Sequence, residues 1–361
     1  MRGRKNKKIL YNLYDRQTLR KKLEEREEGR FTLSFYQYAH IKNPELFRDH
    51  LFLQLSELGV LGRIYVAKEG INAQISLPNK NYDAFVACIN EIEFLKNVRL
   101  NLAVEHDPYS FIKLKIKVRD KIVADGLNDE SFDVTQKGEH VNATRFNELA
   151  ENPDTIIVDM RNHYESEIGH FKNAITPDVD TFRDALKVVE DELQDKKDKN
   201  ILMYCTGGIR CEKASAYYKH KGFKNVFQLE GGIIEYARQV KQQQLENKFV
   251  GSNFVFDDRL AEQISDEVIS ECHQCGTAWA KHKNCANDAC HLLFIQCDSC
   301  AEKHNGCCSA ECEEFITLPE EEQKAFKKGK FFGMQVFKKG RESNFIPAYR
   351  AYKEAKTANK Q

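Results

Sequence analysis

The sequence predicts a multi-domain α/β protein: an N-terminal α+β domain, a central α/β domain with a parallel sheet, and a small cysteine-rich metal-binding region. Strand and helix patterns alternate differently in the first two parts, and nine of the twelve cysteines lie between residues 272 and 312. A chain of 361 residues has room for two or three domains. The expected organisation is a basic extension, the three folded parts and a basic aromatic tail, at residues 1–30, 31–125, 140–245, 255–318 and 324–361.

Charge is unevenly spread, although the formal net charge is zero. Residues 1–30 hold eleven basic and five acidic side chains, residues 151–200 hold seven and thirteen, and residues 324–361 hold eleven and two. Basic ends around an acidic middle favour a polyanionic partner. Lysine-rich ends are also typical of tails that serve only solubility.

The N-terminus MRGRKNKKIL lacks the apolar segment of a signal peptide. No run approaches the ~18 apolar residues of a membrane-spanning helix. We therefore expect a cytoplasmic protein with no membrane partner. In that reducing compartment, the cysteines are expected to serve metal binding or catalysis instead of disulfides.

The N-terminal domain is predicted from the order of its periodic segments. Strands are expected at residues 31–39, 62–67, 71–77 and 112–118, and helices at 45–58 and 82–92. The order βαββαβ indicates a ferredoxin-like domain. In the last strand, four cations share one sheet face: Lys113, Lys115, Lys117 and Arg119. That face predicts a phosphate track for a nucleic acid or, equally, a solvated face whose lysines discourage edge pairing.

The central domain alternates buried strands and helices. Strands are expected at residues 156–159, 201–204 and 226–229, and helices at 181–193, 211–221 and 233–243. This alternation predicts a parallel sheet, and ligands of such sheets bind beyond the carboxyl ends of the strands. Cys205 follows the second strand directly, so it is a candidate catalytic residue.

The segment CTGGIR, which begins at Cys205, predicts a loop that stabilises a sulfur anion. Backbone amides and a helix N-terminus lower a thiol pKa and favour the reactive thiolate. Cysteine-dependent phosphatases use a C-x5-R loop, one residue longer, so this loop is too tight for phosphate. Glycines let amides turn inward, an arginine can donate to an anion, and both argue against an inert cysteine. The anion- or persulfide-stabilising loop comprises Thr206, Gly207, Gly208, Ile209 and Arg210.

Residues 144–240 resemble a rhodanese domain. The matching segments are IVDMR from Ile157, Glu165, GHFKNAI from Gly169, CTGGIR, and LEGG from Leu229. Met160 and Tyr236 depart from the usual valine and tryptophan. The resemblance implies supporting structural roles for Asp159 and Arg161, and a packing role for His170.

Residues 30–345 as a whole resemble the bacterial tRNA uridine-34 hydroxylase family. The resemblance rests on LGRIYVAKEGINAQIS, on the rhodanese segments and on CHLLFIQCDSCAEKHNGCCSAEC. It implies oxygen-dependent formation of 5-hydroxyuridine at the wobble position of tRNA. Molecular oxygen would be the co-substrate, with an electron donor that the sequence does not identify, because no flavin or dinucleotide motif is present.

Our mechanistic hypothesis is that Cys205 forms a persulfide or another covalent sulfur intermediate. Cys211 is then either a resolving thiol or a packing residue in the first turn of the helix. The residues alone indicate persulfide chemistry on a nucleic acid, so two alternatives stay open. One is a sulfurtransferase that moves persulfide sulfur to a thiol or tRNA acceptor, and the other is a zinc-bearing RNA-binding scaffold.

The cysteine-rich region predicts one or two structural zinc ions. Two C-x2-C pairs, Cys272 with Cys275 and Cys297 with Cys300, place thiolates as a tetrahedral ion needs them. A second ion would be held by two earlier cysteines and two of three later ones, with one left over. An iron–sulfur cluster and free structural cysteines are the alternatives. The second set is drawn from Cys285, Cys290, Cys307, Cys308 and Cys312.

The tail interleaves cations such as Lys338 and Lys339 with aromatic residues. Rings can stack on the unpaired bases of an anticodon loop while lysines contact phosphates. The alternative is an amphipathic segment that docks on the central domain.

Overall fold

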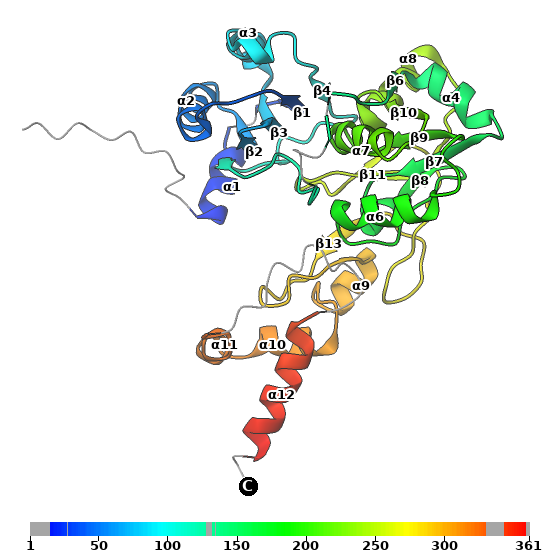
Figure 1. Ribbon diagram of the computed structural model, residues 1–361. Helices are drawn as coiled ribbons and strands as arrows, with labels where there is room; N and C mark the ends of the chain where they lie inside the picture. The colour runs from blue at the N-terminus through cyan, green and yellow to red at the C-terminus, as the bar shows by residue number, and fades with distance from the viewer. Residues whose placement is uncertain (1–14, 27, 128–131, 134, 330–342, 359–361) are drawn as a thin grey trace, which may run out of the picture.

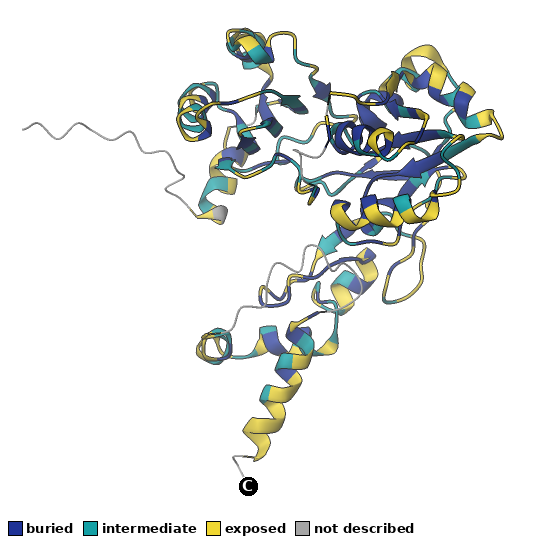
Figure 2. Ribbon diagram, in the orientation of Figure 1, coloured by how far each residue is buried: buried dark blue, intermediate teal, exposed yellow. Residues whose placement is uncertain are grey.

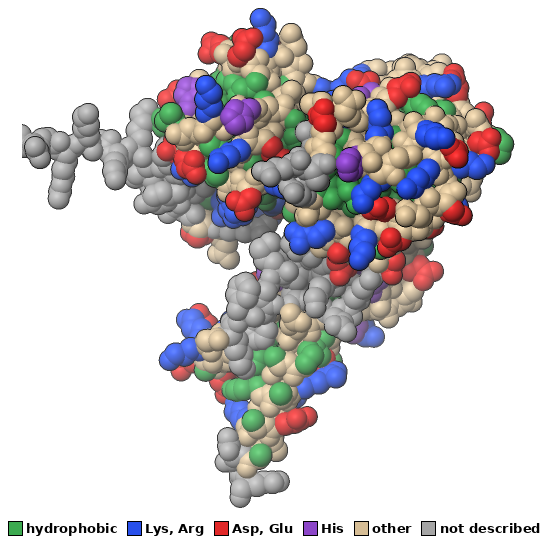
Figure 3. All heavy atoms as spheres, viewed as in Figure 1, with side chains coloured by type: hydrophobic (Ala, Val, Ile, Leu, Met, Phe, Trp, Pro, Cys, Tyr) green, Lys and Arg blue, Asp and Glu red, His purple; other side chains and the backbone are tan. Residues whose placement is uncertain are grey.

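The computed structural model describes residues 15–26, 28–127, 132–133, 135–329 and 343–358. Three parts are visible in Figure 1. The N-terminal and central domains lie side by side, and the cysteine-rich region extends from them and ends in a projecting helix. Figure 3 shows that basic and acidic side chains are interspersed over the visible face of both upper domains. Among the helices that the structure describes, none is long and apolar enough to cross a membrane.

The N-terminal domain carries a five-stranded sheet with strand order β4-β1-β3-β2-β5. Helix α2 starts at a proline preceded by Asn43, whose side chain accepts from the Leu46 N–H at 3.0 Å and caps the helix. The elements are α1 (Arg16–Glu24), β1 (Arg30–Tyr38), α2 (Pro44–Glu57), β2 (Leu61–Ala67), β3 (Gly70–Pro78), α3 (Tyr82–Asn90), β4 (Asn101–Leu102) and β5 (Leu114–Val118), with short 3-10 turns at Asn79–Asn81 and Glu93–Leu95.

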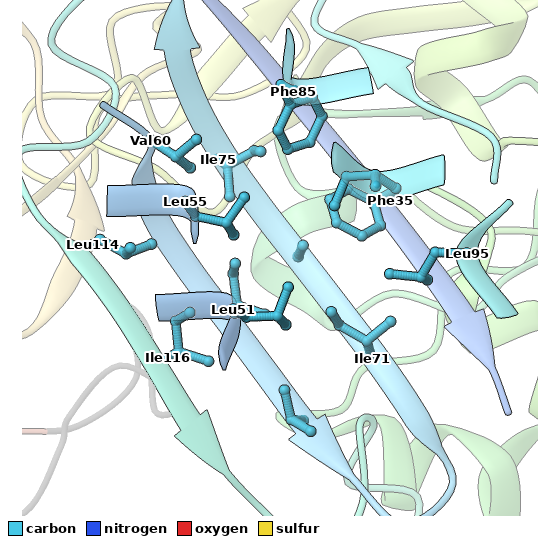
Figure 4. Packing of buried hydrophobic residues seen from close by; sticks show 14 of the residues in the cluster. Phe35, Leu51, Leu55, Val60, Ile71, Ile75, Phe85, Leu95, Leu114 and Ile116 are labelled. Carbon is cyan, nitrogen blue, oxygen red and sulfur yellow. The ribbon is translucent and has the colours of Figure 1, made fainter. Parts of the chain in front are cut away.

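Helices α2 and α3 cover one face of this sheet. Figure 4 shows Leu51 and Leu55 of α2 packed over Ile75 and Ile116 of the strands. Alternate residues of each strand therefore enter this core, and the residues between them form the opposite face. That opposite face carries mostly polar side chains and turns toward the central domain.

The ferredoxin-like prediction is confirmed, but the prediction for its last strand is wrong. The fourth strand of the βαββαβ unit is β4, two residues long and antiparallel to β1. The lysine-rich segment forms a fifth strand, β5, parallel to β2 at the other edge of the sheet. Strict alternation identified β5 as a strand, but alternation carries no information about which strand it pairs with.

The central domain contains a four-stranded parallel sheet with the order β6-β10-β9-β7, as predicted. A three-stranded antiparallel sheet, β12-β11-β8, packs beside it. The elements are β6 (Glu139–Val141), α4 (Ala143–Glu151), β7 (Thr155–Asp159), α5 (His163–Ser166), β8 (Gly169–Phe171), α6 (Phe182–Glu192), β9 (Asn200–Tyr204), α7 (Ile209–His220), β10 (Asn225–Leu229), α8 (Gly232–Gln243), β11 (Phe249–Phe254) and β12 (Ala261–Gln263).

Both faces of the parallel sheet are covered. Helices α6 and α7 bury one set of strand residues, including Ile201 and Met203, and helices α4 and α8 bury the set between them, including Leu202 and Tyr204. Burial on both sides explains why the strand reads ILMY without polar alternation. It also fixes the carboxyl end of β9, where Cys205 lies.

The cysteine-rich region is a small unit with little regular structure. Its core contains Phe326, Phe345 and Tyr349 packed against Cys285 and Cys290. These three tail aromatics are therefore buried against the cysteines, and they are available neither for base stacking nor for docking on the central domain. The distal turns of the last helix are exposed, as Figure 2 shows. The elements are β13 (His282–Asn284), β14 (Leu293–Ile295), α9 (Asp298–Lys303), α10 (Ala310–Thr317), α11 (Glu320–Lys327) and α12 (Phe345–Ala358).

Candidate active site

The loop that begins at Cys205 connects the carboxyl end of β9 to the first turn of α7. Gly208 caps α7 with φ of +97°, a conformation that favours glycine. The carbonyls of Cys205 and Thr206 accept from the N–H groups of Ile233 and Ile234 at 3.0 and 3.3 Å. Because these carbonyls are held by α8, the amides that follow them in the loop are free to face the sulfur.

Gly232 makes this close approach possible. A Cβ at that position would lie 2.5 Å from the carbonyl oxygens of both Cys205 and Thr206. The glycine pair that opens α8 thus supports the sulfur loop directly, in addition to starting a helix.

The Cys205 side chain is fully buried, and its environment favours the thiolate. The Gly208 N–H donates to Sγ at 3.2 Å. Burial by itself raises the Cys205 pKa, but a hydrogen bond from the Cys211 thiol, the charge of Arg210 and further backbone N–H groups lower it to about 6. Burial and the neighbouring Cys205 raise the pKa of Cys211 instead, so Cys211 remains a protonated donor.

Arg210 acts on the sulfur through its charge. Its two terminal nitrogens donate to the two carboxylate oxygens of Glu165, at 2.7 and 2.8 Å, and one also donates to the Thr206 hydroxyl at 3.3 Å. We expected this guanidinium to donate to an anion within the loop. The structure holds it in a bidentate pair with Glu165 instead, which fixes the position of the cation.

A second buried ion pair supports the ends of β7 and β9. Arg161 Nη2 lies 2.6 Å from Asp159 Oδ2 and donates to the Gly169 carbonyl at 2.6 Å. The Tyr204 hydroxyl donates to the same Asp159 carboxylate at 2.8 Å. The Nδ1 atom of His170 lies 3.0 Å from the Phe171 carbonyl oxygen. Asp159, Arg161, His170 and Tyr204 therefore stabilise the backbone around the loop.

A cavity of about 340 Å³ lies between the Cys205 loop and the polar face of the N-terminal sheet. Pockets of about 300–1,000 Å³ hold small molecules or single nucleosides. The central domain contributes Cys205 and Arg210, among others. The N-terminal domain contributes Thr32, Ser34, Tyr36, Arg63, Tyr65, Asn72, Gln74, Asn101 and Ala103.

The two domains are joined by polar contacts to α7. The Tyr36 hydroxyl donates to Glu212 at 3.1 Å. The buried Lys213 ammonium lies 2.7 Å from Glu69 and 3.3 Å from Asp125. Since Glu212 and Lys213 follow the Cys205 loop on the same helix, these contacts fix the N-terminal sheet relative to the sulfur.

Two of the four predicted cations, Lys115 and Lys117, lie on β5 beside residues that line this cavity, while Lys113 directly precedes the strand and Arg119 directly follows it. Lys115 is directly opposite Arg63, and Lys117 is opposite Tyr65. Both partners line the cavity, so the cations share its sheet face. The charges of Lys117 and, to a smaller extent, Lys113 and Arg63 lower the pKa of Lys115, as expected of cations close together. Lys338 and Lys339 lie outside the described residues.

The nine predicted metal-ligand cysteines separate into two groups of four and one remaining thiol. Cys272, Cys275, Cys297 and Cys300 form the first group, which is the favoured grouping from the C-x2-C spacing. The second group is Cys285, Cys290, Cys308 and Cys312. Cys307 is buried outside both, and its carbonyl accepts from Gln274 and Gln296.

Both groups fit a tetrahedral metal ion. The Sγ–Sγ distances are 3.7 Å for Cys275 and Cys297, and 3.6 and 3.8 Å for Cys308 with Cys290 and Cys312. Four thiolates around a zinc ion with Zn–S bonds of about 2.3 Å are about 3.8 Å apart. A disulfide would need about 2.05 Å. These sulfur atoms could hold zinc, and all-thiolate sites are typical of structural ions.

Sequence reasoning missed the part of the site that comes from the N-terminal sheet. In the segments that form β1 and β3, polar residues alternate with apolar ones, at Ser34 and Tyr36 in β1 and at Asn72 and Gln74 in β3. That alternation indicated a polar sheet face, but not that a sulfur loop would lie against it. Asn101 carried no comparable signal, because its strand has two residues.

Three family models match the chain. Residues 30–122 match an acylphosphatase-like domain designated UPF0176, residues 142–239 a rhodanese-like domain, and residues 250–313 a rhodanese C-terminal domain. Relatives from Photorhabdus laumondii and Pectobacterium atrosepticum are 54% and 53% identical over 92% of this chain and 95% and 94% of their own. A Leptospira interrogans relative is 53% identical over 93% of this chain and 91% of its own. All three relatives are named tRNA uridine(34) hydroxylase.

Proposed function

Because this chain belongs to the tRNA uridine(34) hydroxylase family, we propose that it hydroxylates uridine 34 of tRNA in the cavity between its N-terminal and central domains. Cys205 is the catalytic residue of this proposal. The observation that carries it is the position of a thiol with a pKa of about 6 in the wall of a nucleoside-sized cavity. Enzymes that modify a base bring it out of the stack into such a pocket.

The reaction replaces the hydrogen on C5 of uracil with a hydroxyl group. With molecular oxygen as co-substrate, one oxygen atom goes to C5 and the other leaves as water, and a donor supplies two electrons and two protons. The Cys205 thiolate, or a persulfide formed on it, is the sulfur species that the loop holds. The Gly208 N–H, the Cys211 thiol and the Arg210 charge stabilise its negative charge.

The cations beside the cavity are proposed to bind tRNA phosphates. Lys115 and Lys117 are opposite the cavity-lining residues Arg63 and Tyr65, and Lys113 and Arg119 flank them in the chain. An anticodon loop held by these cations would place its first anticodon base near Cys205. Lys338 and Lys339 are further proposed phosphate contacts. Such contacts would make the affinity for tRNA strongly dependent on salt.

The two cysteine groups are proposed to hold structural zinc, one ion each. The ions would contribute folding energy to a region that has little regular structure of its own. Phe326 and Tyr349 pack on the second group, so zinc there would also hold the C-terminal helices.

The experiment that tests the function is mass spectrometry of tRNA nucleosides from cells that carry either the wild-type protein or Cys205→Ala. We expect 5-hydroxyuridine derivatives to disappear in the variant. Cys88→Ala is the matched control, because Cys88 lies on α3, away from the cavity. Unchanged 5-hydroxyuridine with Cys205→Ala would reject the role of Cys205. Unchanged 5-hydroxyuridine together with a fall in a thiolated nucleoside would identify a sulfurtransferase.

A further inference from the structure

A row of polar side chains crosses the N-terminal sheet on the side of the cavity. Asn101 of β4 lies opposite Ser34 of β1, Ser34 opposite Gln74 of β3, and Gln74 opposite Arg63 of β2. All four residues line the cavity. The row begins at the sulfur loop, because Ser34 Oγ and Asn101 Nδ2 each lie 3.8 Å from the place that a Cβ on Gly207 would occupy.

This row has hydrogen-bonding groups that the protein itself does not use. Asn101 is only 3% exposed, and its Oδ1 atom has no hydrogen-bond partner, while its Nδ2 donates to the Gly207 carbonyl at 3.4 Å. The side chains of Ser34 and Gln74 form no hydrogen bond with any residue that the structure describes. Buried polar groups are nearly always paired. The buried Asn101 oxygen is such an unpaired group, and the partly exposed Ser34 and Gln74 side chains line the cavity beside it, so the row points to a polar ligand next to the reactive sulfur.

The chemistry of the row selects a neutral planar base. Within the row, the groups nearest the loop are two amides and a hydroxyl, and cations appear only farther along it, at Arg63 and the adjacent Lys115. The Arg210 cation of the loop itself is already paired with Glu165. Amides offer both donors and acceptors. The pairing edge of uracil presents an acceptor, an N–H donor and a second acceptor, whereas cytosine lacks the N–H and carries an amino donor.

We propose that Asn101, Ser34 and Gln74 read the pairing edge of the uridine base and so determine the specificity of the enzyme for uridine. This inference rests on the proposed function and adds to it the recognition half of the site. The unpaired Asn101 oxygen accepts from the uracil N3–H. With cytosine, that oxygen would face another acceptor and stay unpaired. Leaving one buried acceptor unsatisfied reduces affinity about ten-fold or more.

The test measures base preference in binding, apart from catalysis. Anticodon stem–loop RNAs with uridine or cytidine at position 34 are bound to full-length protein carrying Cys205→Ser, which prevents turnover, and fluorescence anisotropy gives both dissociation constants. We expect about a ten-fold preference for uridine. Asn101→Ala and Gln74→Ala, each added to this protein, should reduce the preference to near one. Gln263→Ala, the same change on an exposed strand residue of the central domain, should leave it intact.

The possible outcomes separate this inference from the proposed function. A preference for uridine that survives both Asn101→Ala and Gln74→Ala would overturn the inference, as would equal binding of the two RNAs by the parent protein. If Asn101→Ala does not fold, Ser34→Ala provides the same test from the neighbouring strand. A uridine preference that depends on these residues, in a protein that forms no 5-hydroxyuridine, would leave the inference standing and reject hydroxylation.

Discussion

Replacing Cys211 with alanine should raise the pKa of Cys205 by about one to two units. The Cys211 thiol is the largest of the groups that lower this pKa, ahead of the Arg210 charge. A hydrogen bond to an ion contributes about 1.5–3 kcal/mol, and one pKa unit corresponds to about 1.36 kcal/mol. The pKa should therefore rise from about 6 in the wild-type protein to about 7–8 in the variant. At pH 7 the thiolate fraction would fall from about nine-tenths to between about a tenth and a half.

The assay is the rate of iodoacetamide alkylation between about pH 5 and pH 9, with the peptide that carries Cys205 quantified by mass spectrometry. At neutral pH alkylation should slow, whereas at high pH it should reach a higher plateau, because a thiolate of higher pKa is the better nucleophile. Cys211→Ser keeps a hydroxyl donor and should preserve the low pKa, and Cys88→Ala should have no effect. A midpoint that stays near 6 with Cys211→Ala would refute the reasoning.

The remaining predictions concern the loop, the RNA and the metal. Gly232→Ala should destabilise the protein and abolish rapid alkylation of the catalytic thiol, because its Cβ would meet backbone atoms at 2.5 Å. Gly222→Ala also has positive φ but no contact closer than 4.0 Å, so it should cost only about 1–2 kcal/mol in urea unfolding, and equal loss of alkylation would contradict the close-contact argument. Replacing Lys115 and Lys117 together by alanine should lower the slope of log affinity for tRNA against log salt by about one to two; an unchanged slope would place the phosphates elsewhere. Cys300→Ser should reduce the zinc content of the purified protein by about one ion per chain, and unchanged content would contradict a first site that needs all four thiolates.

Local patterns predicted the sulfur loop and much of the metal chemistry. The whole sulfur loop lies within the short segment from Cys205 to Arg210, so its residues are neighbours in the chain. A C-x2-C pair likewise needs only one turn of the chain to bring its two thiols together. For the second group, the sequence predicted Cys285 and Cys290 together with two of the three later cysteines, Cys307, Cys308 and Cys312. Spacing alone could not choose between them, because the choice depends on which thiols the packing of Phe315 and the C-terminal helices leaves facing Cys285.

Contacts between distant segments were not predictable in the same way. The pairing of Arg210 with Glu165 joins residues 45 positions apart, and the loop pattern suggested that the guanidinium would bind an anion instead. The cavity joins Ser34 to Cys205 across two domains. Hydrophobic periodicity gives the face of each element, but not which domain covers that face.

The two cysteine groups are interleaved along the chain, since Cys285 and Cys290 fall between the two pairs of the first group and precede its last member, Cys300. During synthesis, the first group is therefore complete when Cys300 leaves the ribosome. At that point Cys308 and Cys312, the other two members of the second group, have not yet left the ribosome. A chain that stopped between Cys300 and Cys308 would have a complete first group, but Cys285 and Cys290 would lack their two partner thiols. We expect such truncated products to carry oxidisable thiols, so the second group forms only in chains whose synthesis has passed Cys312.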